Sequence, residues 1–272
     1  MNFFKKIISK RKKKTAQLRH ELTLNEKIQL YIAGTQGRAI PVREVDLLPE
    51  ILIPCFNHAK YLANMLSVLR GVDVPITIID DNSSEDDRLL IDELRGIFHF
   101  KLIRNEVNLR QGGALNKAIE DSANNLFIVA NADDYLLPGW PDYVIGQFGS
   151  SEIRMMGGMH ICFFNHFPRS ERHLMDVVGS SGYRPQGTLR YYGPEDAKRF
   201  DHDNSIDMTM TGCAFLKSAW MYAGGFLALK DRVSIHDDRD FQMRVCASFQ
   251  VGVSDDLSAF WRSDSSTGMG TK

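Results

Sequence analysis

The chain has 272 residues, of which 43% are hydrophobic and 25% are charged, so it can bury a full core and has the composition of an ordinary globular protein. Its formal net charge of −1 excludes a generic nucleic-acid-binding protein. The sequence has no apolar run of about 18 residues, so it predicts no membrane-spanning helix, and its N-terminus lacks the apolar core of a signal peptide.

The first 20 residues are strongly basic, with eight lysines and arginines and no acidic residue. On a short helix, one face beside these lysines would carry the apolar residues Phe3, Phe4, Ile7 and Ile8. Such a pattern is typical of segments that lie on an anionic membrane surface. A solvated basic tail explains the same charges equally well, and both interpretations stay open.

The cysteines are widely spaced and include no CxxC pair: Cys55, Cys162, Cys213 and Cys246. This spacing favours reduced thiols over a disulfide framework or a zinc site. We therefore expect a cytoplasmic protein, either free or peripheral at the inner face of the cell membrane.

From residue 50 onwards the sequence alternates between apolar strands and amphipathic helices. The predicted strands are 51–53, 75–79, 101–104 and 126–130. The helices predicted between them are 58–70, 84–95 and 111–121, the second with a capping-box pattern at Ser84 and Asp87. This order predicts an α/β fold with a mostly parallel sheet and right-handed crossovers.

The second half of the chain is less regular. We expect strands at 155–164 and 207–216, a long functional loop region at 165–206, a helix at 237–249, and then a short strand with an acidic tail. Asp240 and Arg244 lie four residues apart and predict an ion pair on the last helix. Trp220 fits a core position or a sugar platform equally well.

Two adjacent carboxylates follow the fourth predicted strand, in the turn Asn131-Ala132-Asp133-Asp134. The carboxyl ends of parallel strands are where open α/β sheets bind ligands. Paired carboxylates at such a place suit a hard divalent cation that is shared with a diphosphate. A plain turn or a helix cap would account for the same residues.

Four other segments accompany this turn in a consistent order: Ile53-Pro54-Cys55-Phe56-Asn57, Ile79-Asp80-Asp81-Asn82-Ser83, Asn108 to Asn116, and Asp237-Asp238-Arg239-Asp240-Phe241. Together with Thr211-Gly212-Cys213 and Gly224-Gly225-Phe226, they resemble the inverting family 2 glycosyltransferases of GT-A fold. The resemblance covers about residues 50–265. It implies a Rossmann-like α/β fold, a GT-A domain at 49–272 that follows the basic extension 1–48, and a division of that domain into a nucleotide-binding half (49–140) and an acceptor half with the catalytic base (141–272).

The resemblance implies that a nucleotide lies against the turns after the first three strands. Pro54, Phe56 and Asn57 would receive the base, with the Phe56 ring packed on it. Asp81 would accept a hydrogen bond from a uracil N–H, and Arg110 would contact the nucleotide. The alternatives are a core position for Phe56, a helix cap for Asp81 and a solvated surface position for Arg110.

The metal and the base are also implied by the resemblance. Asp134 would coordinate Mn²⁺ or Mg²⁺, and Asp133 would approach the ribose or the sugar. Asn131 stands where many members carry an acid. Asp238 would be the catalytic base, although acids at a helix start also complement the helix dipole. Asp264 lies in the segment where many members carry a metal-site histidine, and it is our candidate for a second ligand. The alternative is that this tail is a lid loop that orders on donor binding.

We therefore expect an inverting, metal-dependent glycosyltransferase that moves a sugar from a nucleotide-diphospho-sugar, with a UDP-sugar as the first candidate, to a glycan or lipid-linked acceptor of surface polysaccharide synthesis. A non-catalytic nucleotide-sugar-binding homologue or partner subunit is the alternative. A sugar nucleotidyltransferase fits less well, because the turn at Pro54–His58 lacks a glycine-rich phosphate loop.

Overall fold

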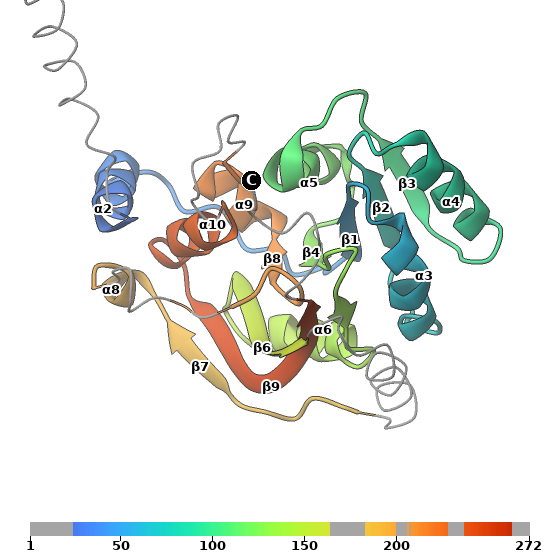
Figure 1. Cartoon of the computed structure of the whole chain (residues 1–272). Helices are drawn as coiled ribbons and strands as arrows, with labels where there is room; N and C mark the ends of the chain where they lie inside the picture. The colour runs from blue at the N-terminus through green and yellow to red at the C-terminus, as the bar shows by residue number, and fades with distance from the viewer. Residues whose placement is uncertain (1–23, 164–182, 200–205, 207, 228–236, 263–272) are drawn as a thin grey trace, which may run out of the picture.

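The fold is that of a computed structural model, which describes residues 24–163, 183–199, 206, 208–227 and 237–262. One twisted sheet runs through it in the order β3-β2-β1-β4-β8-β6-β9-β5, with β7 paired to β9 (Figure 1). None of the helices in these described residues has the length and apolar composition of a membrane span.

The first half is a parallel βα repeat. Its strands are β1 (Pro49–Cys55), β2 (Ile76–Asp80), β3 (Lys101–Arg104) and β4 (Leu126–Val129). Its helices are α3 (Ala59–Val68), α4 (Glu85–Arg95) and α5 (Arg110–Asp121). Each predicted strand and helix of residues 50–130 is present within a few residues of its expected bounds, which confirms the α/β fold class.

The second half joins this sheet through β8 (Ala214–Leu216), which is antiparallel to both β4 and β6 (Met155–Phe163). β9 (Val251–Arg262) then lies parallel to β6 and antiparallel to β5 (Tyr135–Leu136) and β7 (Leu189–Tyr192). The remaining helices are α2 (Leu24–Thr35), α6 (Trp140–Ser150), α8 (Pro194–Ala197), α9 (Lys217–Ala223) and α10 (Asp237–Cys246).

Two sequence predictions for this half are wrong in extent. The last strand is not short, because β9 has 12 residues and continues through Asp255 and Asp256. Their carboxylates accept hydrogen bonds from backbone N–H groups of residues 186–188, so the acids tie a neighbouring segment to the strand instead of ending it. The strand predicted at 207–216 begins only at Ala214, because Gly212 has a φ of +90° that no strand residue adopts.

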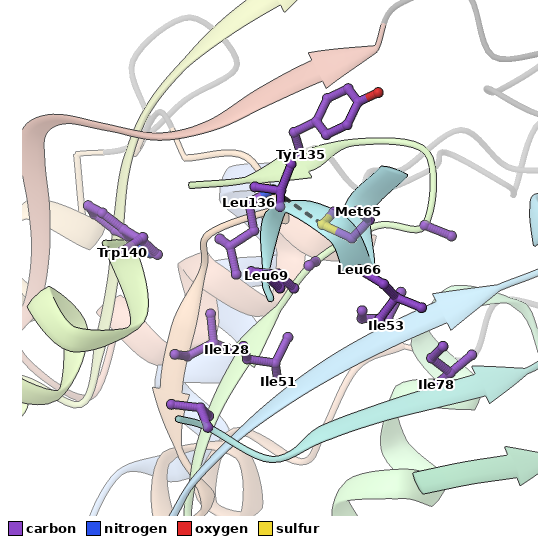
Figure 2. Close-up of a cluster of buried hydrophobic side chains, with 14 of the residues drawn as sticks. Ile51, Ile53, Met65, Leu66, Leu69, Ile78, Ile128, Tyr135, Leu136 and Trp140 are labelled. Carbon is purple, nitrogen blue, oxygen red and sulfur yellow. Dashed lines mark hydrogen bonds between the residues drawn. The ribbon is translucent and has the colours of Figure 1, made fainter. Parts of the chain in front are cut away.

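Alternate residues of the central strands face two separate cores. Ile51 and Ile53 of β1 belong to the core under α3, α4 and α6, whereas Leu52 belongs to the core under α5, α9 and α10. Figure 2 shows the first of these cores, in which the backbone N–H of Leu136 donates to the sulfur of Met65 at 3.4 Å. Helix α3 is thereby tied to the strand that directly follows the acid turn.

Helix α10 is anchored by the predicted ion pair. Arg244 Nη2 lies 2.7 Å from Asp240 Oδ2, and both side chains are buried. Arg244 also donates to the backbone oxygen of Ala223 at the end of α9. The pair therefore fixes α10 against α9, and with it the helix that begins at the expected catalytic base.

Replacing Arg244 by Met should lower the free energy of unfolding by about 3–5 kcal/mol, because it leaves the Asp240 carboxylate buried and unpaired. Urea unfolding followed by circular dichroism measures this change. The control is Glu195→Gln in the exposed Glu195–Lys198 pair, which should change the same free energy by less than about 1 kcal/mol. Equal effects of the two variants would contradict a structural role for the buried pair.

Candidate active site

The expected site residues gather at one edge of the sheet. In a parallel βα unit, the turns after β1, β2 and β4 all lie at the carboxyl edge, and the strand order reverses between β1 and β4. An open α/β sheet binds its ligands at such a switch point. The acid turn after β4 and the turn after β1 meet there, since His58 Nδ1 lies 3.6 Å from Asp133 Oδ2.

Backbone strain is concentrated at this edge. In the described part of the chain, three residues other than glycine have a positive φ: Asn57 at 56°, Asn82 at 65° and Arg110 at 62°. Asn57 and Asn82 lie in the loops after β1 and β2, and Arg110 is the first residue of α5, after β3. Asparagine tolerates this conformation in turns, whereas for arginine it is uncommon and costs of order 1–3 kcal/mol. The start of α5 at Arg110 is therefore the strongest backbone indication of a ligand site.

The turn after β1 presents an exposed aromatic ring. Phe56 is 38% exposed, so it is not a core residue, while Pro54 within β1 is half-buried. The Asn57 carboxamide oxygen accepts from the N–H of Ser84 at 2.8 Å and joins this turn to the one after β2. Burial raises the pKa of the Cys55 thiol to about 12, which leaves no thiolate for a nucleophilic role at neutral pH.

Asp80, at the end of β2, and Asp81 bind residues of the neighbouring loops and do not cap the next helix. The N-cap of α4 is Ser84, whose hydroxyl accepts from the N–H of Asp87 as predicted. Asp80 Oδ1 accepts from the N–H of Ser83 at 2.9 Å, so this acid tethers its own turn. The other oxygen of the same carboxylate lies 3.3–3.4 Å from two arginine Nε atoms.

The carboxylate of Asp81 is buried, and its Oδ1 accepts from Asn105 Nδ2 at 2.8 Å and from the N–H of Leu109 at 2.9 Å. It therefore positions the loop that leads to Arg110. The Arg110 side chain is exposed at the first residue of α5. The next residue, Gln111, donates to Asn131 Oδ1 at 2.6 Å and links the start of α5 to the acid turn.

Asp134 is the most connected residue of the acid turn. Its Oδ2 accepts from Thr211 Oγ1 at 2.5 Å and from Asn131 Nδ2 at 3.2 Å, and its Oδ1 accepts from the backbone N–H of Arg262 at 2.9 Å. The side chain of the neighbouring Asp133 is 14% exposed. Asp134 thus fastens the turn to the chain before β8 and to the end of β9.

Burial and the neighbouring Asp133 raise the pKa of Asp134 to about 7. Burial likewise lowers the pKa of His58, against the opposing effect of Asp133. Both shifts mean that burial in this low-dielectric site disfavours the ionised form of Asp134 and the protonated form of His58. A bound cation would favour the ionised form of Asp134, because an opposite charge nearby lowers the pKa of an acid.

The acid turn fits a divalent cation that is shared with a diphosphate. A carboxylate offers roughly four lone-pair positions, so three hydrogen bonds leave Asp134 room for one further ligand. The described residues contain no group of three or more His, Cys, Asp or Glu side chains that could hold a metal alone. Mg²⁺-type ions commonly take only one or two protein carboxylates and complete their shell with phosphates and water.

The expected base lies near the segment Thr211–Cys213, which also contacts Asp134. The Asp238 carboxylate is close enough to Cys213 to add to the rise in the pKa of that buried thiol, to about 12, of which desolvation is the main cause. Asp238 Oδ1 accepts from the N–H of Arg239 at 2.7 Å in the first turn of α10. One short segment therefore contacts Asp134 through Thr211 and lies beside Asp238 at Cys213.

Three residues make site contacts that the sequence did not predict: His58, Thr211 and Arg262. Thr211 was identified only as part of the motif Thr211-Gly212-Cys213, without a role. Arg262 is 2% exposed, and its Nε donates to the backbone oxygen of Asp133 at 2.8 Å while its guanidinium lies 4.3 Å from the Tyr61 ring centroid. The one available signal was a lone arginine just before the acidic tail. Asp264 lies outside the described residues.

Hydrogen bonds of Asn116 link α5 to the chain before α10. Asn116 Oδ1 accepts from Trp220 Nε1 at 2.9 Å and from the N–H of Phe226 at 2.8 Å, and its Nδ2 donates to the oxygen of Phe226 at 2.8 Å. Trp220 therefore packs, partly buried, against the core. The Phe226 ring packs 4.2 Å from that of Phe241 in α10, so α5 and the base-bearing helix are rigidly joined.

Comparison with known proteins agrees with this geometry. A profile of Glycosyl transferase family 2 matches residues 50–221, more than half of the chain. The chain is a member of glycosyl transferase family 2. It is 29% identical over 102 residues to a poly-β-1,6-N-acetyl-D-glucosamine synthase of Staphylococcus epidermidis, and 28% identical over 122 residues to an uncharacterized glycosyltransferase of Nostoc. These matches cover 36% and 41% of this chain, but only 25% and 35% of the relatives' own lengths.

Two solved structures have a similar fold. TarS 1–349 of S. aureus in complex with UDP-GlcNAc superposes with a TM-score of 0.60 at 14% identity, over 83% of this chain and 61% of TarS 1–349. The mannosyltransferase PcManGT of Pyrobaculum calidifontis, in complex with GDP-Man and Mn²⁺, superposes with a TM-score of 0.56 at 12% identity, over 89% and 66% of the two chains. At these identities the likeness establishes the GT-A fold.

The raised pKa of Asp134 predicts a specific pH dependence of stability. The folded state holds the proton more tightly than the unfolded chain, so the contribution of this group is largest below about pH 4 and falls as the pH rises towards 7. The difference in unfolding free energy between wild type and Asp134→Asn, measured with urea and EDTA, should therefore decrease from pH 4 to 7 and level off above. A difference independent of pH would contradict the buried, desolvated state of Asp134.

Proposed function

We propose that this family 2 enzyme is an inverting, metal-dependent glycosyltransferase that uses a UDP-sugar. The observation that carries the proposal is the segment Thr211–Cys213, which contacts the acid turn at Asp134 and lies beside Asp238. The same short segment therefore links the turn that would hold the donor to the neighbourhood of the carboxylate that would act as base. A single-displacement transfer requires one base close to the donor site.

The donor nucleotide would occupy the loops after β1, β2 and β3. Pro54, Phe56 and Asn57 would contact the base with the exposed Phe56 ring on its face, and Asp81 would meet the uracil edge. Arg110 would lie beside the nucleotide at the N-terminal end of α5, where the helix dipole favours a negative charge. The exposure of Phe56 supports its role.

The chemical step would use one protein base. The Asp238 carboxylate takes the proton of the acceptor hydroxyl, whose oxygen attacks the anomeric carbon opposite the leaving nucleotide. The bond between that carbon and the diphosphate oxygen breaks, and the configuration inverts. Mn²⁺ or Mg²⁺ held by Asp134 would neutralise the departing diphosphate, Asp133 would face the ribose or sugar, and Asp264 is a candidate second ligand.

The similar proteins indicate the classes of donor and acceptor, but not the individual sugars. TarS structures contain UDP-GlcNAc or UDP, whereas PcManGT contains GDP-Man, so the family binds nucleotide sugars of both kinds. We favour UDP because Asp81 offers a carboxylate to the imide N–H of uracil. The acceptor is a glycan or a lipid-linked saccharide of surface polysaccharide synthesis, by analogy with the Staphylococcus epidermidis synthase. The basic extension 1–48 would attach the domain 49–272 reversibly to the cytoplasmic face of an anionic membrane.

Thermal shifts with UDP, GDP, CDP and dTDP, each with and without Mn²⁺, test the donor site. UDP should raise the unfolding temperature of wild type in a Mn²⁺-dependent manner, since a ligand at about 100 times its dissociation constant adds roughly 2.7 kcal/mol of stability. Asp134→Ala should lose the Mn²⁺-dependent part. A preference for GDP would overturn the role of Asp81 but keep the enzyme class, whereas no shift with any nucleotide would favour a non-catalytic homologue.

Asp238→Asn tests the base. Transfer should fall by at least about 100-fold, the usual contribution of general base catalysis, while the UDP thermal shift is retained. The matched control is Asp86→Asn, an exposed acid in the first turn of α4 that also complements a helix dipole; it should retain full activity. Full activity of Asp238→Asn would mean that Asp238 only complements the helix dipole of α10 and is not the catalytic base.

A further inference from the structure

An exposed tryptophan lies at the end of β9, directly beside the acid turn. β6 and β9 run parallel and end together, with Cys162 paired to Trp261 and Phe163 paired to Arg262. Trp261 is 41% exposed, whereas Trp140 is fully buried and Trp220 packs on the core. A large apolar ring left in solvent at the edge of an active site is typical of a ligand-binding surface.

The ring lies within reach of a sugar at the acid turn. The backbone N–H of Arg262 is bonded to Asp134 Oδ1 at 2.9 Å. Since the Cα of a residue lies about 2.4 Å from the next backbone nitrogen, the Cα of Trp261 is within about 5.5 Å of that oxygen. The distance is about one pyranose ring, so the indole and the acid turn can contact the same saccharide.

The strand end is held in place. The Arg262 side chain is buried against Tyr61 and the backbone of Asp133. Successive strand residues point to opposite faces, so Trp261 points away from that packing. The His160 ring meets the indole edge to face at 6.1 Å between centroids. The aromatic surface is therefore rigid before any ligand binds.

Irregular pairing sets this orientation. The β6–β9 register shifts between Gly157 and Met159 and again between Met159 and His160, where Ser258 Oγ donates to the oxygen of Met159. Such bulges bend strands and re-aim the side chains that follow, and they are common next to active sites. Here they lie just before the exposed strand end.

The face of β9 on which the indole lies decides which substrate this surface meets. The expected nucleotide contacts follow β1, β2 and β3, and the turn after β1 leads into α3, on whose Tyr61 the Arg262 side chain packs. Trp261 points to the opposite face of β9, away from these contacts. Inversion requires the acceptor oxygen to approach opposite the leaving nucleotide. A ligand surface on that face therefore suits the acceptor and not the donor base.

We infer that Trp261, braced by His160, is a stacking platform for a pyranose ring of the saccharide acceptor. A pyranose has an apolar C–H face and a polar rim, which match the apolar body and the N–H of an indole. The inference rests on the proposed function and adds the residue that selects a sugar ring as acceptor. Trp261 acts on acceptor binding alone.

The test separates acceptor binding from donor binding. UDP release from UDP-GlcNAc with Mn²⁺ is measured with and without a panel of short saccharides, which includes β-1,6- and β-1,4-linked N-acetylglucosamine oligomers and mannose oligomers. Trp261→Ala should raise the acceptor KM about 10-fold or more, as expected for loss of one stacked ring. Its donor KM should stay within about 2-fold of the wild-type value, and so should the dissociation constant for UDP that is derived from the thermal shift. Trp261→Phe should recover most of the acceptor affinity.

The matched control is Tyr191→Ala, an aromatic residue on β7 that is 49% exposed and lies opposite Gly252, near the other end of β9; it should leave both KM values unchanged. An unchanged acceptor KM in Trp261→Ala, or an equal rise in the donor KM, would overturn the inference. So would a wild-type enzyme that binds UDP but is stimulated by no saccharide of the panel. Failure of wild type to bind any nucleotide would instead overturn the proposed function.

Discussion

The site depends on the hydrogen bonds that the buried carboxylate of Asp134 accepts. This carboxylate accepts hydrogen bonds from the turn itself, from Thr211 before β8 and from the backbone of Arg262 at the end of β9. These segments are far apart in sequence, and the carboxylate brings them to one point. A buried acid without such donors would be costly to keep, so the same hydrogen bonds that satisfy Asp134 assemble the site.

This arrangement places different tasks in different parts of the sheet. The parallel strands β1 to β4 end in turns that suit a nucleotide, and β8 carries the chain past Asp134 towards the helix of Asp238. β6 and β9 extend the sheet and end at Trp261. Asn116 joins these regions, because its three hydrogen bonds hold the turn before α10 against α5.

The sequence allowed the first half of the fold to be predicted well, because each strand from 51 to 130 is a short apolar run bounded by clear turn residues. The turns at Pro54–Asn57, Asp80–Ser83 and Asn131–Asp134 could be identified for the same reason, and strand order then brought them together. α6 was missed because Pro141, Gly146 and Gly149 weaken its helical pattern. A short strand was expected in place of β9 because Asp255 and Asp256 are polar, but both acids bind backbone N–H groups about 70 residues away in the sequence.

The contacts of Arg262, Thr211 and His58 could not be predicted from local pattern. Each depends on tertiary register: Arg262 reaches Asp134 only because β5 pairs with β9 at Tyr135 and Phe260. A lone arginine or histidine carries no distinctive local signal, since it is usually a surface or packing residue, and the motif Thr211-Gly212-Cys213 gave no contact for Thr211. The acid turn itself was readable in the sequence, but the residues that hold it in place were not.

The most direct test of the central claim is a crystal structure grown with UDP and Mn²⁺, with anomalous diffraction recorded at the manganese edge. The account predicts one strong anomalous peak about 2.0–2.2 Å from the carboxylate of Asp134, a distance typical of small divalent ions, with the uracil between Phe56 and Asp81 and the diphosphate bridging to the metal. A peak away from Asp134, or a nucleotide bound elsewhere than at the ends of β1, β2 and β4, would contradict it.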